Sequence, residues 1–159
     1  NAKIYKVLSH KYIDSKYSIW LDGNIMININ EQDLIDKFLG AADIAVFAHP
    51  RRKCIYAEHP EARNRVAPEF YTLMDEQVRN YRNEGMPPNF GLAECGMIIR
   101  RNTPVVNEFN EKWWAEICRY TQRDQMSFPY VWWKMKEKIH INLIQGNVRE
   151  HPYFKYIQR

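Results

Sequence analysis

An aspartate and an asparagine flank a glycine directly after an apolar segment near the start of the chain. The segment reads SIWLDGNIMI over residues 18–27, with Asp22, Gly23 and Asn24 at its centre. Asp-Gly between apolar runs is a strong signal for a β-hairpin turn. A carboxylate and an amide two residues apart can also turn both oxygens toward one Mg²⁺ or Mn²⁺, ions that prefer oxygen ligands. The sequence therefore supports two hypotheses for Asp22, a hairpin turn or a metal site at a strand end.

Basic side chains follow a second apolar segment, DIAVFAHPRR, over residues 43–52. His49, Arg51 and Arg52 stand at its end. Arginine can bind two phosphate oxygens at once, and it can equally pair with a carboxylate of its own protein. The segment predicts either a phosphate-binding loop or a solvated surface loop.

Two more segments carry acids that could contact a sugar. NFGLAEC, residues 89–95, places Glu94 just before an apolar run, where its carboxylate could accept hydrogen bonds from hydroxyl groups. Asp124 and Gln125 open a helical pattern, a position at which acids and amides are also ordinary caps. A glycine-rich turn and a helix cap are the structural alternatives for these two segments.

The elements that must position these residues alternate between strands and helices. We expect strands at 17–22, 24–29, 43–50, 96–101 and 141–144, and helices at 1–12, 31–40, 68–85, 104–120 and 124–138, the last kinked at Pro129 or starting after Ser127. Residues 51–65 and 86–95 read as loops, and residues 151–159 as a tail. This alternation predicts one α/β domain over residues 1–159 with a partly parallel sheet.

Ligands of such sheets bind at the carboxyl ends of the strands. Asp22, His49 and Arg51 lie at such ends, and we place Arg100 and Arg101 beyond another. We therefore expect Asp22, Glu94 and Asp124 to line one pocket.

Composition excludes several classes of protein. The chain is 45% hydrophobic and 26% charged, which is typical of a globular domain. A net charge of +4, with basic residues dispersed among acids, argues against nucleic-acid binding and is compatible with an anionic substrate. The three cysteines match no zinc pattern, and no apolar run is long enough to span a membrane.

Taken together and in order, several segments resemble a known family. They are NAKIYKVL, YSIWLDGNIMI, DIAVFAHPRRKCIYAE, EQVRNYRNEGMPPNFGLAECGMIIRRN, FNEKWWAEI and RDQMSFPYVWWK, which cover roughly residues 1–135. The set is similar to the glycosyltransferase-like family, formerly a domain of unknown function, that has plant mucilage-related and bacterial members. The resemblance implies the GT-A nucleotide-diphospho-sugar transferase fold, a mixed sheet flanked by helices. Only about 17 residues precede the motif strand, so we expect this chain to lack the N-terminal nucleotide-binding βαβ half.

The resemblance also implies roles for particular residues. Asp22 and Asn24 fall at the family's Asp-x-Asp metal motif, with an amide in place of the second carboxylate, and His151 is a positional guess for a late metal ligand. Mn²⁺ or Mg²⁺ is the implied cofactor, bound more weakly because of Asn24. Glu94, Asp124 and Gln125 are expected near the sugar or the acceptor, and His49, Arg51 and Arg52 near the diphosphate.

The implied activity is transfer of a hexose from a nucleotide sugar to a glycan or other hydroxyl acceptor, as in polysaccharide synthesis. We expect a cytoplasmic location for a bacterial chain, which we prefer, and the Golgi lumen for a eukaryotic one. Two alternatives stay open: a non-catalytic carbohydrate-binding or assembly module of the same fold, and a metal-assisted hydrolase that uses Asp22.

Overall fold

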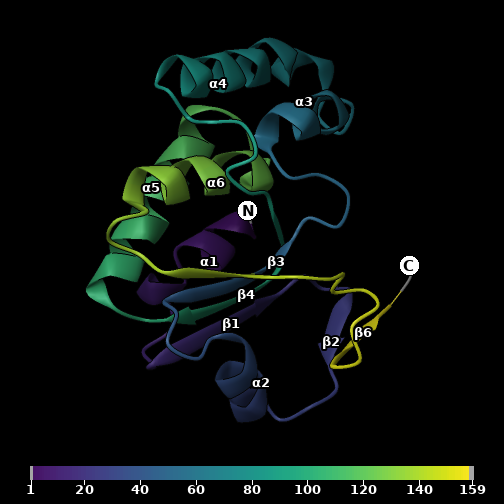
Figure 1. The fold of residues 1–159 in the computed structure, drawn as a ribbon, viewed down its shortest axis with the longest axis vertical. Helices are drawn as coiled ribbons and strands as arrows, with labels where there is room; N and C mark the ends of the chain where they lie inside the picture. Colours follow the sequence, from purple (N-terminus) through teal and green to yellow (C-terminus); the bar gives the residue numbers. More distant parts are fainter. Residues whose placement is uncertain (1, 158–159) are drawn as a thin grey trace.

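A four-stranded mixed sheet forms the centre of the molecule (Figure 1). The computed structural model describes residues 2–157. The strand order is β1-β4-β3-β5, with β4 antiparallel to β1 and β3, and with β3 parallel to β5. A separate antiparallel pair joins β2 to β6. The strands are β1 (Tyr17–Leu21), β2 (Ile25–Ile27), β3 (Ile44–Ala48), β4 (Ala93–Arg101), β5 (Ile141–Ile144) and β6 (Phe154–Tyr156).

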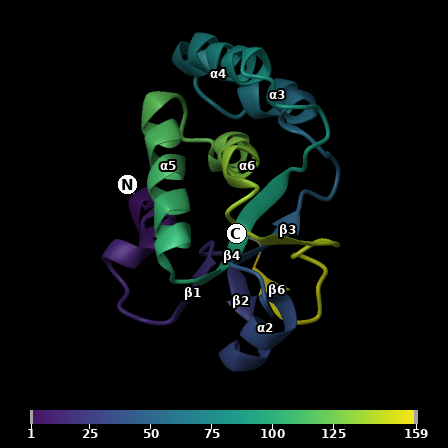
Figure 2. The ribbon, with the colours of Figure 1, turned by 60° about the vertical axis from the view of Figure 1, so that its left-hand side comes forward.

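Helices cover both faces of this sheet. In both views, α1, α5 and α6 lie on one face with α3 and α4 stacked beyond them, whereas α2 lies on the other (Figures 1 and 2). The α-helices are α1 (Lys3–Val7), α2 (Glu31–Phe38), α3 (Ile55–Arg63), α4 (Tyr71–Asn83), α5 (Pro104–Arg119) and α6 (Asp124–Met135), with 3-10 turns at Ser9–Lys11 and Pro68–Phe70. This arrangement confirms the expected α/β class with a mixed sheet flanked by helices. Within residues 2–157 we find no helix with both the length and the apolar character needed to cross a membrane.

Strict alternation along β3 explains why both faces are covered. Ile44 and Val46 pack into the core under α1, α5 and α6, whereas Ala45 and Phe47 pack into the core with α2 and β6. Successive strand residues point to opposite faces, so a continuous apolar run must have apolar partners on each side. The DIAVFA segment therefore specifies a central strand, which is where it lies.

The reversed direction of β4 brings its first residues to the functional edge of the sheet. Leu21 at the end of β1 pairs with Met97, and Ala48 at the end of β3 pairs with Ala93. The amino-terminal end of β4 thus meets the carboxyl-terminal ends of β1 and β3. Arg100 and Arg101, which we expected at this edge, lie at the opposite end, where they pair with Ser18 and Tyr17. That expectation was wrong because it assumed that β4 runs parallel to its neighbours.

Asp22 and Gly23 form a turn but not a hairpin. The amide of Ile25 donates a hydrogen bond to the Asp22 carbonyl at 2.9 Å, which closes the turn. The strands on either side pair with β4 and β6 rather than with each other. The hairpin alternative is therefore wrong, and the turn redirects the chain from the main sheet to the small one.

Three segments that we expected to be irregular contain regular structure. The Arg-rich segment that we read as a loop contains α3, the carboxyl-terminal tail contains β6, and β4 begins at Ala93 inside the segment expected to be irregular. Helix α6 begins at Asp124 and continues past Pro129, so it does not start after Ser127. Its buried side chains, which include Met126, Phe128 and Val131, outweigh the hydrogen bond that proline removes.

Gly91 provides a test of how the fold is packed at this edge. Its φ is +137°, and a Cβ added there would lie 3.0 Å from Trp132 Cζ3. We predict that Gly91→Ala lowers the free energy of unfolding by about 1–3 kcal/mol through backbone strain plus this contact. Gly146→Ala is the matched control. Gly146 has a φ of +112°, and a Cβ added there would meet no atom within 4 Å, so this substitution introduces the backbone strain without the contact. Equal losses for the two variants, measured by urea unfolding, would contradict a packing role for Gly91.

Candidate functional site

A cavity of about 1040 Å³ opens at the carboxyl ends of β1, β3 and β5. The three segments that we expected to share one pocket all line it, through Asp22, Glu94 and Asp124. Eight Lys or Arg side chains and four carboxylates line the cavity: Lys3, Lys6, Arg51, Arg52, Lys53, Arg65, Arg123 and Arg149 against Asp22, Glu94, Asp124 and Glu150. The cavity is therefore large enough for a nucleotide-sized ligand and favours an anionic one.

A buried ion pair joins α1 to the start of α6 at the cavity wall. Lys6 Nζ lies 2.7 Å from Asp124 Oδ2, and the two side chains are only 4% and 6% exposed. Lys3 Nζ lies 2.9 Å from the same oxygen. Burial alone raises the pKa of Asp124, but the charges of Lys6 and Lys3 overcome it and hold that pKa below the ordinary value of 3.8. Asp124 is therefore an ionised carboxylate that pairs with both Lys6 and Lys3.

Lys6 also contacts Asp22, so one ammonium connects three elements. Its Nζ donates to Asp22 Oδ1 at 3.2 Å, and Trp20 Nε1 donates to the same oxygen at 2.8 Å. Burial lowers the pKa of Lys6, but nearby negative charge, above all that of Asp124, overcomes that effect, so the pKa lies above its ordinary value of 10.5. Lys6 is consequently a fixed, permanently charged cation between two carboxylates.

Arg100 holds this lysine in place from beneath. The Arg100 side chain is fully buried, and its Nη2 donates to the Lys6 carbonyl at 2.9 Å. Its Nη1 lies 3.5 Å from Ser9 Oγ. The short helix α1 is thus anchored to β4 by a charged hydrogen bond, which is stronger than a neutral one.

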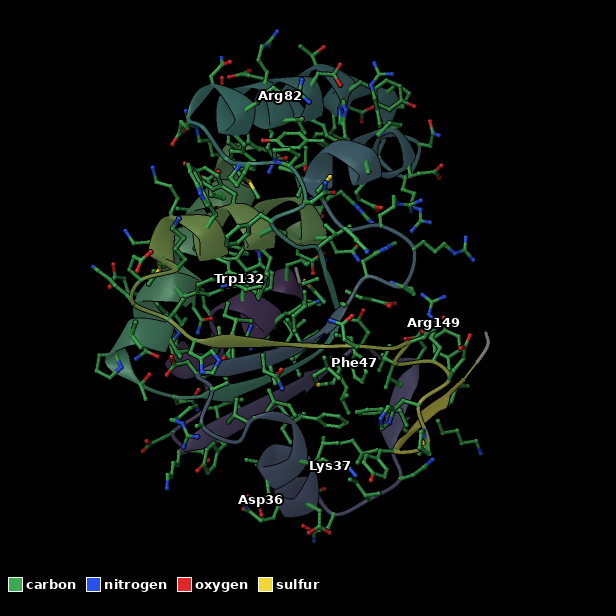
Figure 3. The ribbon with its side chains drawn as sticks, in the orientation of Figure 1. Asp36, Lys37, Phe47, Arg82, Trp132 and Arg149 are labelled. Atoms are coloured by element: carbon green, nitrogen blue, oxygen red, sulfur yellow. The ribbon has the colours of Figure 1, made fainter. Side chains whose placement is uncertain are left out.

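Glu94 stands apart from the lysine pair on the same wall. It forms an ion pair with Arg149, whose Nη2 lies 3.5 Å from Glu94 Oε1 and whose side chain is about half exposed. Figure 3 shows Arg149 on the same side of the molecule as the loop that follows β3. Within residues 2–157, Glu94 Oε2 is buried without a hydrogen-bond partner. Burial, followed by the charge of Asp22, raises the pKa of Glu94 above 4.5 despite Arg149.

The loop after β3 is shaped by His49 and Glu58. His49 Nδ1 accepts hydrogen bonds from the backbone amides of Arg51 and Arg52 at 3.3 and 3.1 Å. Burial, followed by the nearby arginines, lowers the pKa of His49, which agrees with a neutral ring that accepts at Nδ1. Arg52 Nε pairs with the fully buried carboxylate of Glu58. Of the two arginines, Arg51 is the exposed one, and no side-chain partner for it is found within residues 2–157.

Gln125 lies at the cavity next to Asp124, as expected. Arg123 Nη2 donates to Gln125 Oε1 at 3.0 Å, and the Gln125 amide donates to Asp124 Oδ1 at 3.2 Å. These bonds order the Arg-Asp-Gln segment at the start of α6, so its carboxylate serves as an internal anchor while Arg123 and Gln125 face the cavity.

The residues expected to bind a metal ion do not come together. Asn24 Nδ2 donates to the Tyr156 hydroxyl at 2.9 Å, and Asn24 does not line the cavity. His151 packs edge-on against Phe38, Phe47 and Phe154 and does not line the cavity either. Asp22 Oδ1 already accepts from Lys6 and Trp20. Nowhere in residues 2–157 do three or more His, Cys, Asp or Glu side chains gather as metal ligands. Of the expected set Asp22, Asn24 and His151, only Asp22 therefore lines the cavity, and the three residues do not form one Mn²⁺ or Mg²⁺ site together.

Sequence reasoning missed the lysines and Arg149. Lys3 and Lys6 are one helical turn apart, so they share a face of α1, and this spacing was the available signal. This spacing was not enough to assign the lysines to the site, because the sequence near them does not show that α1 packs beside the end of β1 and the start of α6. Arg149 follows a strand end, but so do many solvated arginines.

The buried ion pair gives a stability prediction. Asp124→Asn should lower the free energy of unfolding by about 3–5 kcal/mol at pH 7, because Lys6 loses its main buried partner. The pKa of Asp124 is lowered on folding, so its contribution is present above the unfolded value of about 3.9 and is lost as the pH falls through the folded value. The gap between wild type and variant in urea unfolding should therefore shrink at pH 3.

Asp36→Asn is the control, since Asp36 is exposed on α2 and only accepts a hydrogen bond from Gln32. A loss below about 1 kcal/mol for Asp124→Asn would show that the buried pair does not hold α1 to α6.

Comparison with known proteins gives a consistent family assignment. The family described as "TOD1/MUCI70, glycosyltransferase-like domain" matches residues 1–156. The chain is 30% identical over 142 residues to "Probable hexosyltransferase MUCI70" of Arabidopsis thaliana, a match covering 82% of this chain and 24% of that protein. It is 23% identical over 171 residues to "Alkaline ceramidase TOD1" of the same plant, a match covering 98% of this chain and 36% of that protein.

A solved structure is also similar. Mouse xyloside xylosyltransferase 1, in its apo form, matches with a TM-score of 0.47 and 16% sequence identity, over 94% of this chain and 55% of that one. The chain spans between about a quarter and about a third of the length of the two plant relatives. From the match over residues 1–156, the chain belongs to the TOD1/MUCI70 glycosyltransferase-like family, as the sequence predicted.

Proposed function

We propose that this domain transfers a sugar from a nucleoside-diphosphate sugar to a hydroxyl acceptor in glycan synthesis. One observation carries the proposal: the cavity at the sheet edge is lined by twice as many Lys and Arg side chains as carboxylates. A diphosphate is the anionic part of such a donor, and clustered arginines and lysines bind it through charge-assisted hydrogen bonds. Membership of a glycosyltransferase-like family supports this choice among anionic ligands.

Arg51 and Arg123 are well placed to contact the diphosphate. Both line the cavity, and neither forms an ion pair within residues 2–157. Arg52 is less available, because its guanidinium pairs with buried Glu58. We therefore assign Arg51 to diphosphate binding and give Arg52 and His49 the task of holding the loop.

Glu94 is a better candidate for the general base than Asp124. Asp124 is held between two lysines and its pKa is lowered, so it is a weak proton acceptor. Glu94 has one buried oxygen without a partner within residues 2–157 and a raised pKa, which makes it the stronger base. In the proposed step, the acceptor oxygen bonds to the sugar anomeric carbon and its proton passes to Glu94. The bond from that carbon to the diphosphate breaks, and its electron pair leaves with the nucleoside diphosphate.

A hydrolase is the second candidate, because one relative is named an alkaline ceramidase. A ceramide-like substrate is mostly apolar and would need an apolar groove. The cavity is instead lined largely by charged and polar residues, including eight Lys or Arg. The charge of the cavity therefore favours the transferase over the lipid hydrolase. A non-catalytic module would bind the donor without turnover.

The role of Glu94 predicts a pH profile. A base must be deprotonated, so the transfer rate should rise with pH through a pKa above 4.5. Glu94→Gln should lower the rate by roughly 10²–10⁴-fold and remove this acidic limb. Initial rates of nucleoside diphosphate release from a panel of nucleotide sugars, with acceptor present, measure both effects. Glu137→Gln, at an exposed position outside the cavity, is the control. An unchanged profile for Glu94→Gln would assign the base elsewhere.

Substitutions of Arg51 and Arg52 should have different effects on ligand binding and on stability. Arg51→Gln should weaken inorganic pyrophosphate binding by about tenfold while leaving the free energy of unfolding nearly unchanged. Arg52→Gln should mainly lower stability, because it leaves the buried carboxylate of Glu58 without its cation. Calorimetric titration and urea unfolding of both variants check this, and equal behaviour of the two would contradict the assignment.

A further inference from the structure

The ammonium of Lys6 retains binding capacity that the fold does not use. It carries three N–H donors. Within residues 2–157 it has two acceptors, Asp124 Oδ2 at 2.7 Å and Asp22 Oδ1 at 3.2 Å. The same side chain lines the cavity although it is only 4% exposed. The Nζ also lies 5.8 Å from the centroid of the Trp20 ring, so one N–H has no oxygen or nitrogen acceptor among the described residues, in a place largely shielded from solvent.

Stability does not account for this arrangement well. A buried ion pair costs so much desolvation that apolar residues of similar volume are often equally stable or more so. Here two lysines and two carboxylates gather at a cavity wall rather than in the closed core. An arrangement that keeps a buried ammonium charged and rigid is useful where that charge must meet a ligand.

Lys6 places a positive charge beside Asp22, where the resemblance led us to expect a metal ion. Asp22 is the residue that the resemblance places in the metal motif, and its Oδ1 binds Lys6 instead. Asn24 and His151 do not line the cavity. The cation next to the motif aspartate is thus a side chain of the protein itself.

Building on the proposed function, we propose that Lys6 is the fixed cation of the donor site and binds an oxygen of the donor diphosphate, so that donor binding needs no divalent ion. Asp124 and Asp22 orient the ammonium, and Arg100 fixes the backbone of Lys6 through its carbonyl. A positive charge held in advance also stabilises the negative charge that grows on the leaving diphosphate. Lys3, on the same helical face, adds positive charge beside Asp124.

Calorimetric titration tests this with two probes, inorganic pyrophosphate and UDP, each in EDTA and in Mn²⁺. Wild-type protein should bind pyrophosphate in EDTA, and Mn²⁺ should change that affinity by less than about threefold. Lys6→Met should weaken binding in EDTA by at least tenfold, equivalent to about 1.4 kcal/mol. Lys138→Met removes the same charge from an exposed position outside the cavity and should stay within twofold.

The outcomes separate the inference from the proposed function. Pyrophosphate binding that requires Mn²⁺, or that is equal in Lys6→Met and wild type, would overturn the role of Lys6 and leave the transferase proposal intact. Failure of both probes to bind wild type in either buffer would reject the diphosphate site and the proposed function together.

A folding defect in Lys6→Met would not block the test. The comparison of EDTA with Mn²⁺ uses wild-type protein alone. The double variant Lys6→Met, Asp124→Asn removes both buried charges at once, and it should fold while binding pyrophosphate at least tenfold more weakly than wild type. Wild-type affinity in that double variant would overturn the proposal.

Discussion

The ion pair between Lys6 and Asp124 is the interaction on which the rest of the site depends. It joins the first helix to the start of α6, and through Asp22 it also fixes the turn after β1. Lys6 and Asp124 would each be costly to bury alone, so each holds the other in place, whereas Asp22 is about half exposed. The segments around Lys6, Asp22 and Asp124 thereby acquire one fixed geometry at the cavity wall.

The direction of β4 is the second constraint. Because β4 runs antiparallel to β1 and β3, its first residues arrive where its neighbours end. Glu94 consequently lies near Asp22, close enough for the charge of Asp22 to raise its pKa. Asp124 is held charged by Lys3 and Lys6, whereas Glu94 has one buried oxygen without a hydrogen-bond partner among the described residues. Two acids in contrasting environments suit two tasks, with Asp124 organising the site and Glu94 free to exchange a proton.

Local patterns in the sequence predicted the elements whose signals are local. The apolar run of β3 and the capped helix α2, with Asn30 accepting from the Gln32 amide, lie where the sequence places them. Helix α3 was missed because Pro60 and four charged or histidine side chains obscure its pattern, and tertiary packing of Ile55 and Ala62 compensates. β6 was missed because a three-residue strand is determined by its partner β2. In the site, the sequence indicated Asp22, Glu94 and Asp124. It did not indicate that Lys3 and Lys6 line the cavity and that Asn24 and His151 lie outside it, because these placements depend on long-range packing.

A crystal structure of the domain with pyrophosphate, grown in EDTA, would show directly whether Lys6 is the fixed cation of the donor site. A diphosphate oxygen should lie within about 3 Å of Lys6 Nζ, with Asp22 and Asp124 still bound to the same ammonium. A diphosphate that lies elsewhere in the cavity, with Lys6 contacting only its two carboxylates, would contradict it.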